Sequence, residues 1–353
     1  MASVDLTGWR WQAKRFWIGR AVSALRRTWR TPVAAVRAQR AERADNRQSR
    51  IPPPAQRRRE VRSVLSFQSG PGRWEWLADS IEAVEASDGG ETQIVVIDDC
   101  SVDTRESVIR ERFPEVEVVR LPYPTGGPPS GWNVMRTGIL HALEHYDFSL
   151  YVKMDTDAIV TAPSFSDTVL EHLGCGERPG IAGSCGVRCD GAEEDRRFHQ
   201  LVLAREMRRN RPLRTAYERA ISGGWREGEI VQGGALCITP GAAREISQEG
   251  WLDWRRPWSS QLPDDLLVSM FIAACGYELV SLGHPEGIFA IGNKYIPLTK
   301  EEIATGPWVV AHSTREDIAG TPEPQLRAFF RQHRDAWQLK TSEKRAGDRK
   351  SSD

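Results

Sequence analysis

The sequence lacks any apolar run of the ~18 residues that a membrane-spanning helix needs, so no segment is expected to cross a bilayer. It also lacks a good export signal, because Arg20 interrupts the most apolar stretch near the start, residues 16–25. Cysteine is scarce, with 6 in 353 residues, and no two cysteines have the Cys-x-x-Cys spacing of compact zinc sites. These absences predict a cytoplasmic protein with reduced thiols. A zinc ion would have to be held by Cys175, Cys185, Cys189 and His199.

The sequence also has no net charge, but its charges are unevenly spread. Residues 1–59 hold 15 Arg or Lys against 3 Asp or Glu, so the rest of the chain is acidic. Tryptophans alternate with arginines in this basic arm, which is typical of a segment lying in an anionic lipid headgroup layer, here on the inner membrane face. A helix packed on the body, or a disordered arm, fits the composition equally well. Nucleic-acid binding is not expected, because the basic charge is confined to one arm.

The folded domain is expected to begin at about residue 60, after a stiff linker of three prolines and three arginines at 52–59. Short β-branched runs then alternate with helical segments. Strands are predicted at 61–67, 94–97 and 116–121, and helices at 74–85 and 104–113. Strand, helix and strand in this order form right-handed crossover units, which predicts a doubly wound α/β sheet.

An acidic pair lies in the stretch 148–162, FSLYVKMDTDAIVTA, where a buried-type strand ends at Asp155 and Asp157. Ligands of α/β proteins gather at the carboxyl ends of strands. Hard carboxylate oxygens suit Mg²⁺ or Mn²⁺, which take further ligands from a substrate phosphate. A solvated turn after the strand explains the same two residues. The pair is therefore a candidate metal site that needs support from the rest of the chain.

Four segments in order, IVVIDDCSVD, the Gly-rich loop 122–130, NVMRTGILHAL and YVKMDTDA, together resemble the nucleotide-binding half of GT-A glycosyltransferases, particularly family 2. The resemblance covers about residues 61–160. It implies that Asp98, or its neighbour Asp99, accepts a hydrogen bond from the base of a nucleotide, with uracil favoured. It also implies that Arg136 contacts the diphosphate and that Asp155 takes part in donor and metal binding. A turn at the aspartates and a surface charge at Arg136 explain these residues without a ligand.

A second acidic centre opens a predicted helix at Leu-Pro-Asp264-Asp265, which runs to Cys275 and stops at Gly276. Helix starts favour aspartate through the helix dipole, so plain N-terminal stabilisation is one interpretation. The other comes from resemblance: family-2 enzymes have an acidic pair at this distance before Gly-Tyr, and fringe-type GT-A enzymes join a GGALCIT-like strand to Leu-Pro-Asp-Asp. In both, one aspartate is the catalytic base of an inverting transfer. The spacing assigns this role to Asp265, with Asp264 as the alternate.

Two later residues complete the predicted site. A strand at 308–312 ends at His312, which resembles the metal-binding histidine of several GT-A families, although such a histidine is also commonly just hydrogen-bonded. The segment 283–306 resembles a lid, and Lys294 within it is a candidate diphosphate contact. The predicted metal ligands are thus Asp155, Asp157 and His312.

We therefore expect an α/β, GT-A (Rossmann-like) fold with a mixed, mostly parallel sheet flanked by helices. The expected domain covers residues 60–335, with a nucleotide-sugar half at 60–160 and an acceptor half at 161–335, and residues 336–353 form a disordered tail. The expected function is a metal-dependent (Mn²⁺ or Mg²⁺) inverting glycosyltransferase of envelope or extracellular glycan synthesis, with a UDP-sugar donor and a glycan or lipid-linked acceptor. The alternatives are a sugar nucleotidyltransferase, which the sequence QSGPGRW matches poorly, and a non-catalytic nucleotide- or glycan-binding scaffold.

Overall fold

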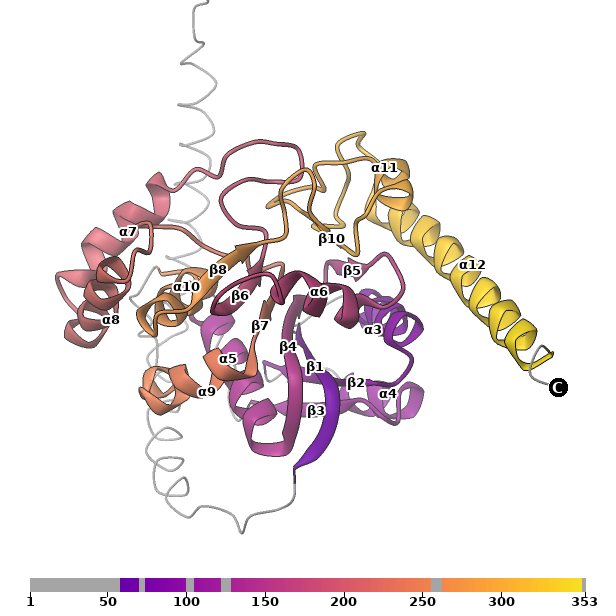
Figure 1. Ribbon diagram of the computed structural model, residues 1–353, viewed down its shortest axis with the longest axis horizontal. Helices are drawn as coiled ribbons and strands as arrows, with labels where there is room; N and C mark the ends of the chain where they lie inside the picture. The colour runs from indigo at the N-terminus through magenta and orange to yellow at the C-terminus, as the bar shows by residue number, and fades with distance from the viewer. Residues whose placement is uncertain (1–57, 70–73, 100–104, 122–127, 255–261, 351–353) are drawn as a thin grey trace, which may run out of the picture. The chain divides into compact units, whose positions relative to one another are not determined.

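A computed structural model describes residues 58–69, 74–99, 105–121, 128–254 and 262–350. Contacts group Arg57–Asp353 into one compact unit. The basic arm before residue 58 and most of the predicted Gly-rich loop lie outside the described residues, so the expectations for them stay predictions. Figure 1 shows the described elements and their labels.

A seven-stranded sheet forms the centre of this unit (Figure 1). Its strand order is β3-β2-β1-β4-β7-β6-β8. The first four of these strands are mutually parallel, β7 runs antiparallel between β4 and β6, and β8 is parallel to β6. The mixed, mostly parallel sheet flanked by helices is therefore confirmed. The strands are β1 (Arg59–Ser69), β2 (Thr92–Asp98), β3 (Glu117–Arg120), β4 (Tyr146–Asp155), β6 (Pro179–Gly183), β7 (Ala235–Ile238) and β8 (Glu278–Ser281).

Strand β4 contributes side chains to the hydrophobic core on both faces of the sheet. Its side chains alternate between the faces of the sheet, so Tyr151 packs with one cluster, which includes residues of helices α5 (Pro128–His145) and α10 (Asp264–Ala274). Val152 and Met154 pack with the other cluster, which includes residues of α3 (Trp74–Asp88). By the same alternation Lys153 points to the face of α5 and α10. Lys153, the buried one among the charged side chains of this strand, is thereby directed toward the start of α10.

A second, three-stranded sheet was not predicted. It has the order β5-β10-β9 and consists of β5 (Ala158–Val160), β9 (Phe289–Ile291) and β10 (Val310–His312). In Figure 1, β5 and β10 are seen beside the end of β4. Because β10 pairs antiparallel with β5, His312 lies opposite Ala158. The small sheet thus carries a residue from late in the chain to the turn that follows β4.

The helix predicted at 104–113 is observed as α4 (Arg105–Arg112). The tail is an exception: α12 extends to Lys350, where the sequence predicts disorder from residue 336. Residues 338–350 include three Lys and two Arg, which favour helix, and contain no proline. Among the described residues, no helix has both the length and the hydropathy of a membrane span. The helices not yet given bounds are α6 (Phe165–Leu173), α7 (Arg197–Met207), α8 (Arg211–Ser222), α9 (Pro240–Gln248), η1 (Trp251–Asp253), α11 (Lys300–Thr305) and α12 (Glu323–Lys350).

Candidate active site

The structure brings three of the predicted residues together at the end of β4. Asp155 is the last residue of β4, Asp157 follows in the turn to β5, and His312 ends β10. His312 Nε2 lies 3.3 Å from Asp157 Oδ1 and 3.8 Å from Asp155 Oδ2. One ligand atom from each of the three residues lies within 4.8 Å of the others. Two carboxylates and an imidazole at this spacing could hold a divalent metal ion.

Asp157 is held so that one of its oxygens is directed to the triad. Its Oδ2 accepts hydrogen bonds from Ser313 Oγ and Arg315 Nε, both at 2.9 Å, which leaves Oδ1 on the side of His312. Burial raises the pKa of Asp157, but the opposing contributions of His312 and Arg315 are larger together and hold it well below its ordinary value. The carboxylate is therefore ionised at neutral pH, as a metal ligand must be.

The turn Asp155-Thr156-Asp157 is fixed from behind by helix α12. Arg327 is 3% exposed, and its Nη2 donates to the carbonyl of Thr156 at 2.8 Å. Its Nη1 donates to the buried carboxylate of Asp79 at 3.1 Å. The amide and hydroxyl of Thr314 both donate to the carbonyl of Asp157. Buried, hydrogen-bonded partners of this kind limit how far the two candidate ligands can move.

The second acidic centre lies at the first turn of α10. Asp265 Oδ1 accepts from the amide of Leu266 at 2.8 Å, and its Oδ2 accepts from the amide of Gly233 at 3.3 Å. Burial, followed by the nearby charge of Asp264, raises the pKa of Asp265 to about 7, against the lowering effect of Lys153. A carboxylate with a pKa near neutrality is suited to take a proton from a hydroxyl group.

Lys153 lies between the two centres, and the sequence reasoning did not include it in the site. Its Nζ donates to Asp155 Oδ1 at 2.7 Å and to the carbonyl of Gly233, and it lies 3.9 Å from Asp264 Oδ2. The signal in the sequence was a lysine within the mainly apolar stretch 150–154. Its partners come from distant segments, and nothing in the local pattern names them.

Two further aspartates lie at the same edge of the sheet. Asp98 is the last residue of β2 and is 5% exposed, and its Oδ2 lies 3.7 Å from Arg120 Nε. Strand β1 lies between β2 and β4, so Asp98 and Asp155 are two strand spacings apart, and each spacing is about 4.8 Å. Asp99 follows, half-buried, with its amide bonded to the carbonyl of Ser69. The predicted base-binding aspartates thus flank the metal candidate.

The two predicted basic contacts are placed differently. Arg136 Nε donates to the carbonyl of Leu252 in η1 at 2.6 Å, so this group helps hold η1 against α5. Lys294 is exposed in the segment between β9 and α11, and no contact with the triad is present among the described residues. Arg315 is the basic residue that the structure places beside the triad instead, with 66% of its side chain exposed. It follows His312 by three residues, a spacing to which the sequence reasoning gave no weight.

Gly234 has no space for a side chain. A Cβ at this position would overlap the His312 ring, whereas a Cβ at Gly233 would lie at ordinary contact distance, 3.4 Å from Asp265 Cβ and 3.6 Å from Lys153 Nζ. His312 Nδ1 is buried and has no hydrogen-bond partner among the described residues. The orientation of this ring therefore depends on packing against Gly234.

Gly234→Ala is expected to weaken Mn²⁺ binding by about tenfold or more, because the methyl group displaces the His312 ring from the carboxylates. Gly233→Ala is the matched control, and we expect its Mn²⁺ affinity to stay within about threefold of the wild type. Isothermal titration with MnCl₂ measures both. Equal affinities in the two variants would show that the ring position does not depend on Gly234.

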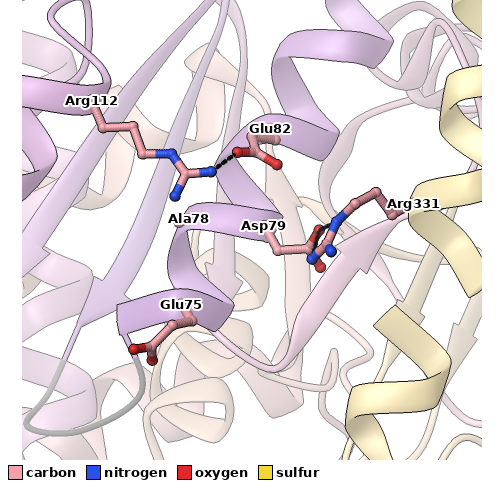
Figure 2. Close-up of a pocket in the computed structure, with 6 residues that line it drawn as sticks. All are labelled: Glu75, Ala78, Asp79, Glu82, Arg112 and Arg331. Atoms are coloured by element: carbon pink, nitrogen blue, oxygen red, sulfur yellow. Dashed lines mark hydrogen bonds and ion pairs between the residues drawn. The ribbon is translucent and has the colours of Figure 1, made fainter. Parts of the chain in front are cut away.

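A pocket of about 360 Å³ lies elsewhere, beside α3 (Figure 2). Four of its charged groups form two ion pairs, Arg112 with Glu82 and Arg331 with Asp79. None of its lining residues is a predicted site residue. We place the site at the triad, because the ligand geometry and the second acidic centre are found there. The pocket is lined by Glu75, Ala78, Asp79, Glu82, Arg112 and Arg331.

The four zinc candidates are not among the metal-binding groups of the described residues. Cys175, Cys185 and Cys189 are free thiols, with Cys185 and Cys189 buried. The His199 ring interacts through Nδ1 with the carbonyl of Gly228 at 3.2 Å.

No protein-family model and no curated protein matches the sequence. Solved structures do match. A mannosyltransferase, PcManGT from Pyrobaculum calidifontis, in complex with GDP-Man and Mn²⁺, is 17% identical over 70% of this chain and 61% of its own length, with a TM-score of 0.38. S. aureus TarS is 12% identical over 63% of this chain and 35% of its own length, with a TM-score of 0.40. TarS 1–349 in complex with UDP-GlcNAc is 11% identical over 63% of this chain and 56% of its own length, with a TM-score of 0.40. The chain therefore spans less than two thirds of the length of each, and we base the function on the geometry of its own site.

Proposed function

We propose that the protein is a metal-dependent glycosyltransferase that moves a sugar from a nucleotide-diphosphate donor to a hydroxyl acceptor with inversion. The observation that carries the proposal is that two acidic centres of different character converge on one lysine at the carboxyl edge of the sheet. The triad of Asp155, Asp157 and His312 suits a metal ion, and the centre at Asp264 and Asp265 suits proton transfer.

The donor would lie along the carboxyl edge of the sheet. Asp98 would accept a hydrogen bond from the base, and Mn²⁺ or Mg²⁺ held by the triad would neutralise the diphosphate as it leaves. Arg315 supports this assignment, because it uses its Nε for Asp157 and presents the rest of an exposed guanidinium beside the triad. A guanidinium fork is suited to phosphate oxygens.

The acceptor would be activated at α10. In an inverting transfer the hydroxyl oxygen bonds to the anomeric carbon as the bond to the diphosphate breaks, and the hydroxyl proton passes to a carboxylate. Asp265 is our candidate for this base, since its pKa is raised to about 7, with Asp264 as the alternate. The base and the leaving group then act on opposite sides of the sugar.

A thermal-shift panel of UDP-, GDP-, dTDP- and CDP-sugars with Mn²⁺ tests the proposal. At a concentration of about 100 Kd a ligand stabilises the folded state by about 2.7 kcal/mol, so at least one donor is expected to raise Tm by roughly 5 °C, and EDTA to remove the shift. Slow metal-dependent hydrolysis of the same donor is expected. A shift without hydrolysis or transfer would indicate the binding scaffold, and pyrophosphate release from a nucleoside triphosphate with a sugar phosphate would indicate a nucleotidyltransferase.

Four predictions about the acceptor and the cellular setting stay predictions: a glycan or lipid-linked acceptor, a role in polysaccharide synthesis, a cytoplasmic location, and contact of the basic arm with an anionic membrane.

A further inference from the structure

Lys153 is buried in the middle of the molecule, where a charge is costly. Its exposed fraction is 2%, and it belongs to the largest fully buried side chains. An ammonium group taken out of water loses several kcal/mol of hydration, which only close acceptors and opposite charge offset. A lysine that served only to fill this space could be replaced by an apolar side chain of similar volume.

The ammonium of Lys153 joins three segments of the chain. It donates to the carboxylate of Asp155 at the end of β4 and to the carbonyl of Gly233 in the segment before β7, and it faces Asp264 at the start of α10, 3.9 Å away. Burial lowers its pKa, but the carboxylates raise it more, so the pKa lies above the ordinary value. The group is therefore a permanent cation at neutral pH.

A continuous set of hydrogen bonds leads from the metal candidate to the candidate base. Asp155 Oδ1 accepts from Lys153, and Lys153 also donates to the carbonyl of Gly233. The amide of the same glycine donates to Asp265 Oδ2 at 3.3 Å. The position of Asp265 is thus linked to that of Asp155 through one side chain and one backbone residue.

The charges at this place fit the same interpretation. Four carboxylates, Asp155, Asp157, Asp264 and Asp265, face two cationic side chains, Lys153 and Arg315. Above the pKa of Asp265, which is about 7, all four carboxylates are ionised and the six groups together carry two negative charges, which a divalent cation matches. Without Lys153 the net charge of the remaining groups would be three negative charges, spread over two centres that no longer share a positively charged neighbour.

We propose that Lys153 is a positioning residue that fixes the metal-binding carboxylate Asp155 and the candidate base Asp265 relative to each other. The inference rests on the proposed function for the roles of these two aspartates. It adds that the two centres are mechanically and electrostatically coupled through one buried ammonium.

Lys153→Met retains the length of the side chain and removes the charge. We expect Mn²⁺ to bind about tenfold more tightly, because the loss of a positive charge beside the site outweighs the loss of the one hydrogen bond that orients Asp155 Oδ1. The rise in Tm on adding saturating Mn²⁺ should exceed that of the wild type. Calorimetry and thermal shift measure both effects, and neither requires sugar transfer, so they stand even if the proposed activity is not found.

In kinetic assays we expect Lys153→Met to lower kcat strongly and to leave the donor KM nearly unchanged. Transfer by Lys153→Met should lose at least about a hundredfold in kcat, because a base displaced by about 1 Å is poorly aligned. The donor KM should stay within about threefold, since the metal site is retained. An unchanged Mn²⁺ affinity, or equal losses in kcat and in apparent donor affinity, would overturn the proposal in favour of a purely structural lysine.

A double variant keeps the proposal testable if Lys153→Met folds poorly. Asp264→Asn removes the carboxylate that the ammonium faces, so Lys153→Met/Asp264→Asn should regain part of the Tm lost by Lys153→Met alone in metal-free buffer. Lys153→Met/Asp253→Asn is the matched control, because Asp253 is an exposed aspartate in η1, and it should regain nothing. A double variant with Asp264→Asn that is no more stable than the single variant contradicts the coupling.

Discussion

Asp157→Ala is expected to abolish metal-dependent chemistry. The substitution removes one of three candidate ligands, the one whose second oxygen is fixed by Ser313 and Arg315. We expect Mn²⁺ affinity to fall at least about a hundredfold and donor hydrolysis and transfer to fall at least about a thousandfold, since the leaving diphosphate loses its counter-charge. Calorimetry with MnCl₂ and a coupled assay for nucleoside diphosphate release measure these losses.

Loss of the fold must be separated from loss of the metal. Asp157→Ala leaves the buried Ser313 hydroxyl without its acceptor, which costs about 1–3 kcal/mol of stability, whereas Arg315 is exposed and stays hydrated. Circular dichroism at the assay temperature shows whether the variant is folded. Asp167→Ala, an exposed aspartate in α6, is the control and should keep full activity. A folded Asp157→Ala protein with normal Mn²⁺-stimulated hydrolysis would refute the metal assignment.

The parallel half of the sheet was predictable because its strands are buried on both faces. Residues 94–97 form an unbroken β-branched run, and the structure buries all four. Helix α3 was predicted at 74–85 and is observed at Trp74–Asp88. These elements were predictable because the apolar pattern is clear over the whole segment.

The small sheet was not predictable in the same way. Strands β5, β9 and β10 have three residues each, too few to show a period, and the pairing of β10 with β5 joins segments about 150 positions apart. The prediction that Asp155, Asp157 and His312 act together came from resemblance, and pairing of β10 with β5 is what brings them together. Proximity of this kind depends on tertiary structure, to which a single sequence gives no direct access.

The side-chain partners of the basic residues also depend on tertiary structure and could not be predicted from the sequence. Arg136 lies on α5, and the direction of its side chain depends on η1, whose carbonyl at Leu252 accepts its hydrogen bond. Lys153 was visible as a charge inside an apolar strand, yet its role follows from Gly233 and Asp264, which lie about 80 and 110 positions away. A buried charge in a strand indicates that partners exist, and the fold decides which they are.

The two acidic centres should respond differently to substitution by neutral amides, because in the proposed function one would hold a metal ion and the other would accept a proton. Asp265→Asn removes the candidate base and leaves the triad and Lys153 in place. We expect kcat to fall by about 10²–10⁴, while Mn²⁺ and donor affinities change by less than about threefold. Asp264→Asn, measured in parallel, decides between the assigned base and its alternate: the larger loss of kcat identifies the base.

The pH dependence gives an independent test of the same residue. A base must be deprotonated to act, and the pKa of Asp265 is raised to about 7. For the wild type, kcat/KM should therefore rise as pH increases through about 7 and level off above it, and Asp265→Asn should lose this rise along with the rate. Transfer with inversion also requires the product to have the opposite anomeric configuration to the donor, which ¹H NMR of the first turnover shows. Retention of configuration, or an unchanged pH profile in both aspartate variants, would move the proton transfer away from α10 and leave these two residues with the plain role of stabilising a helix start.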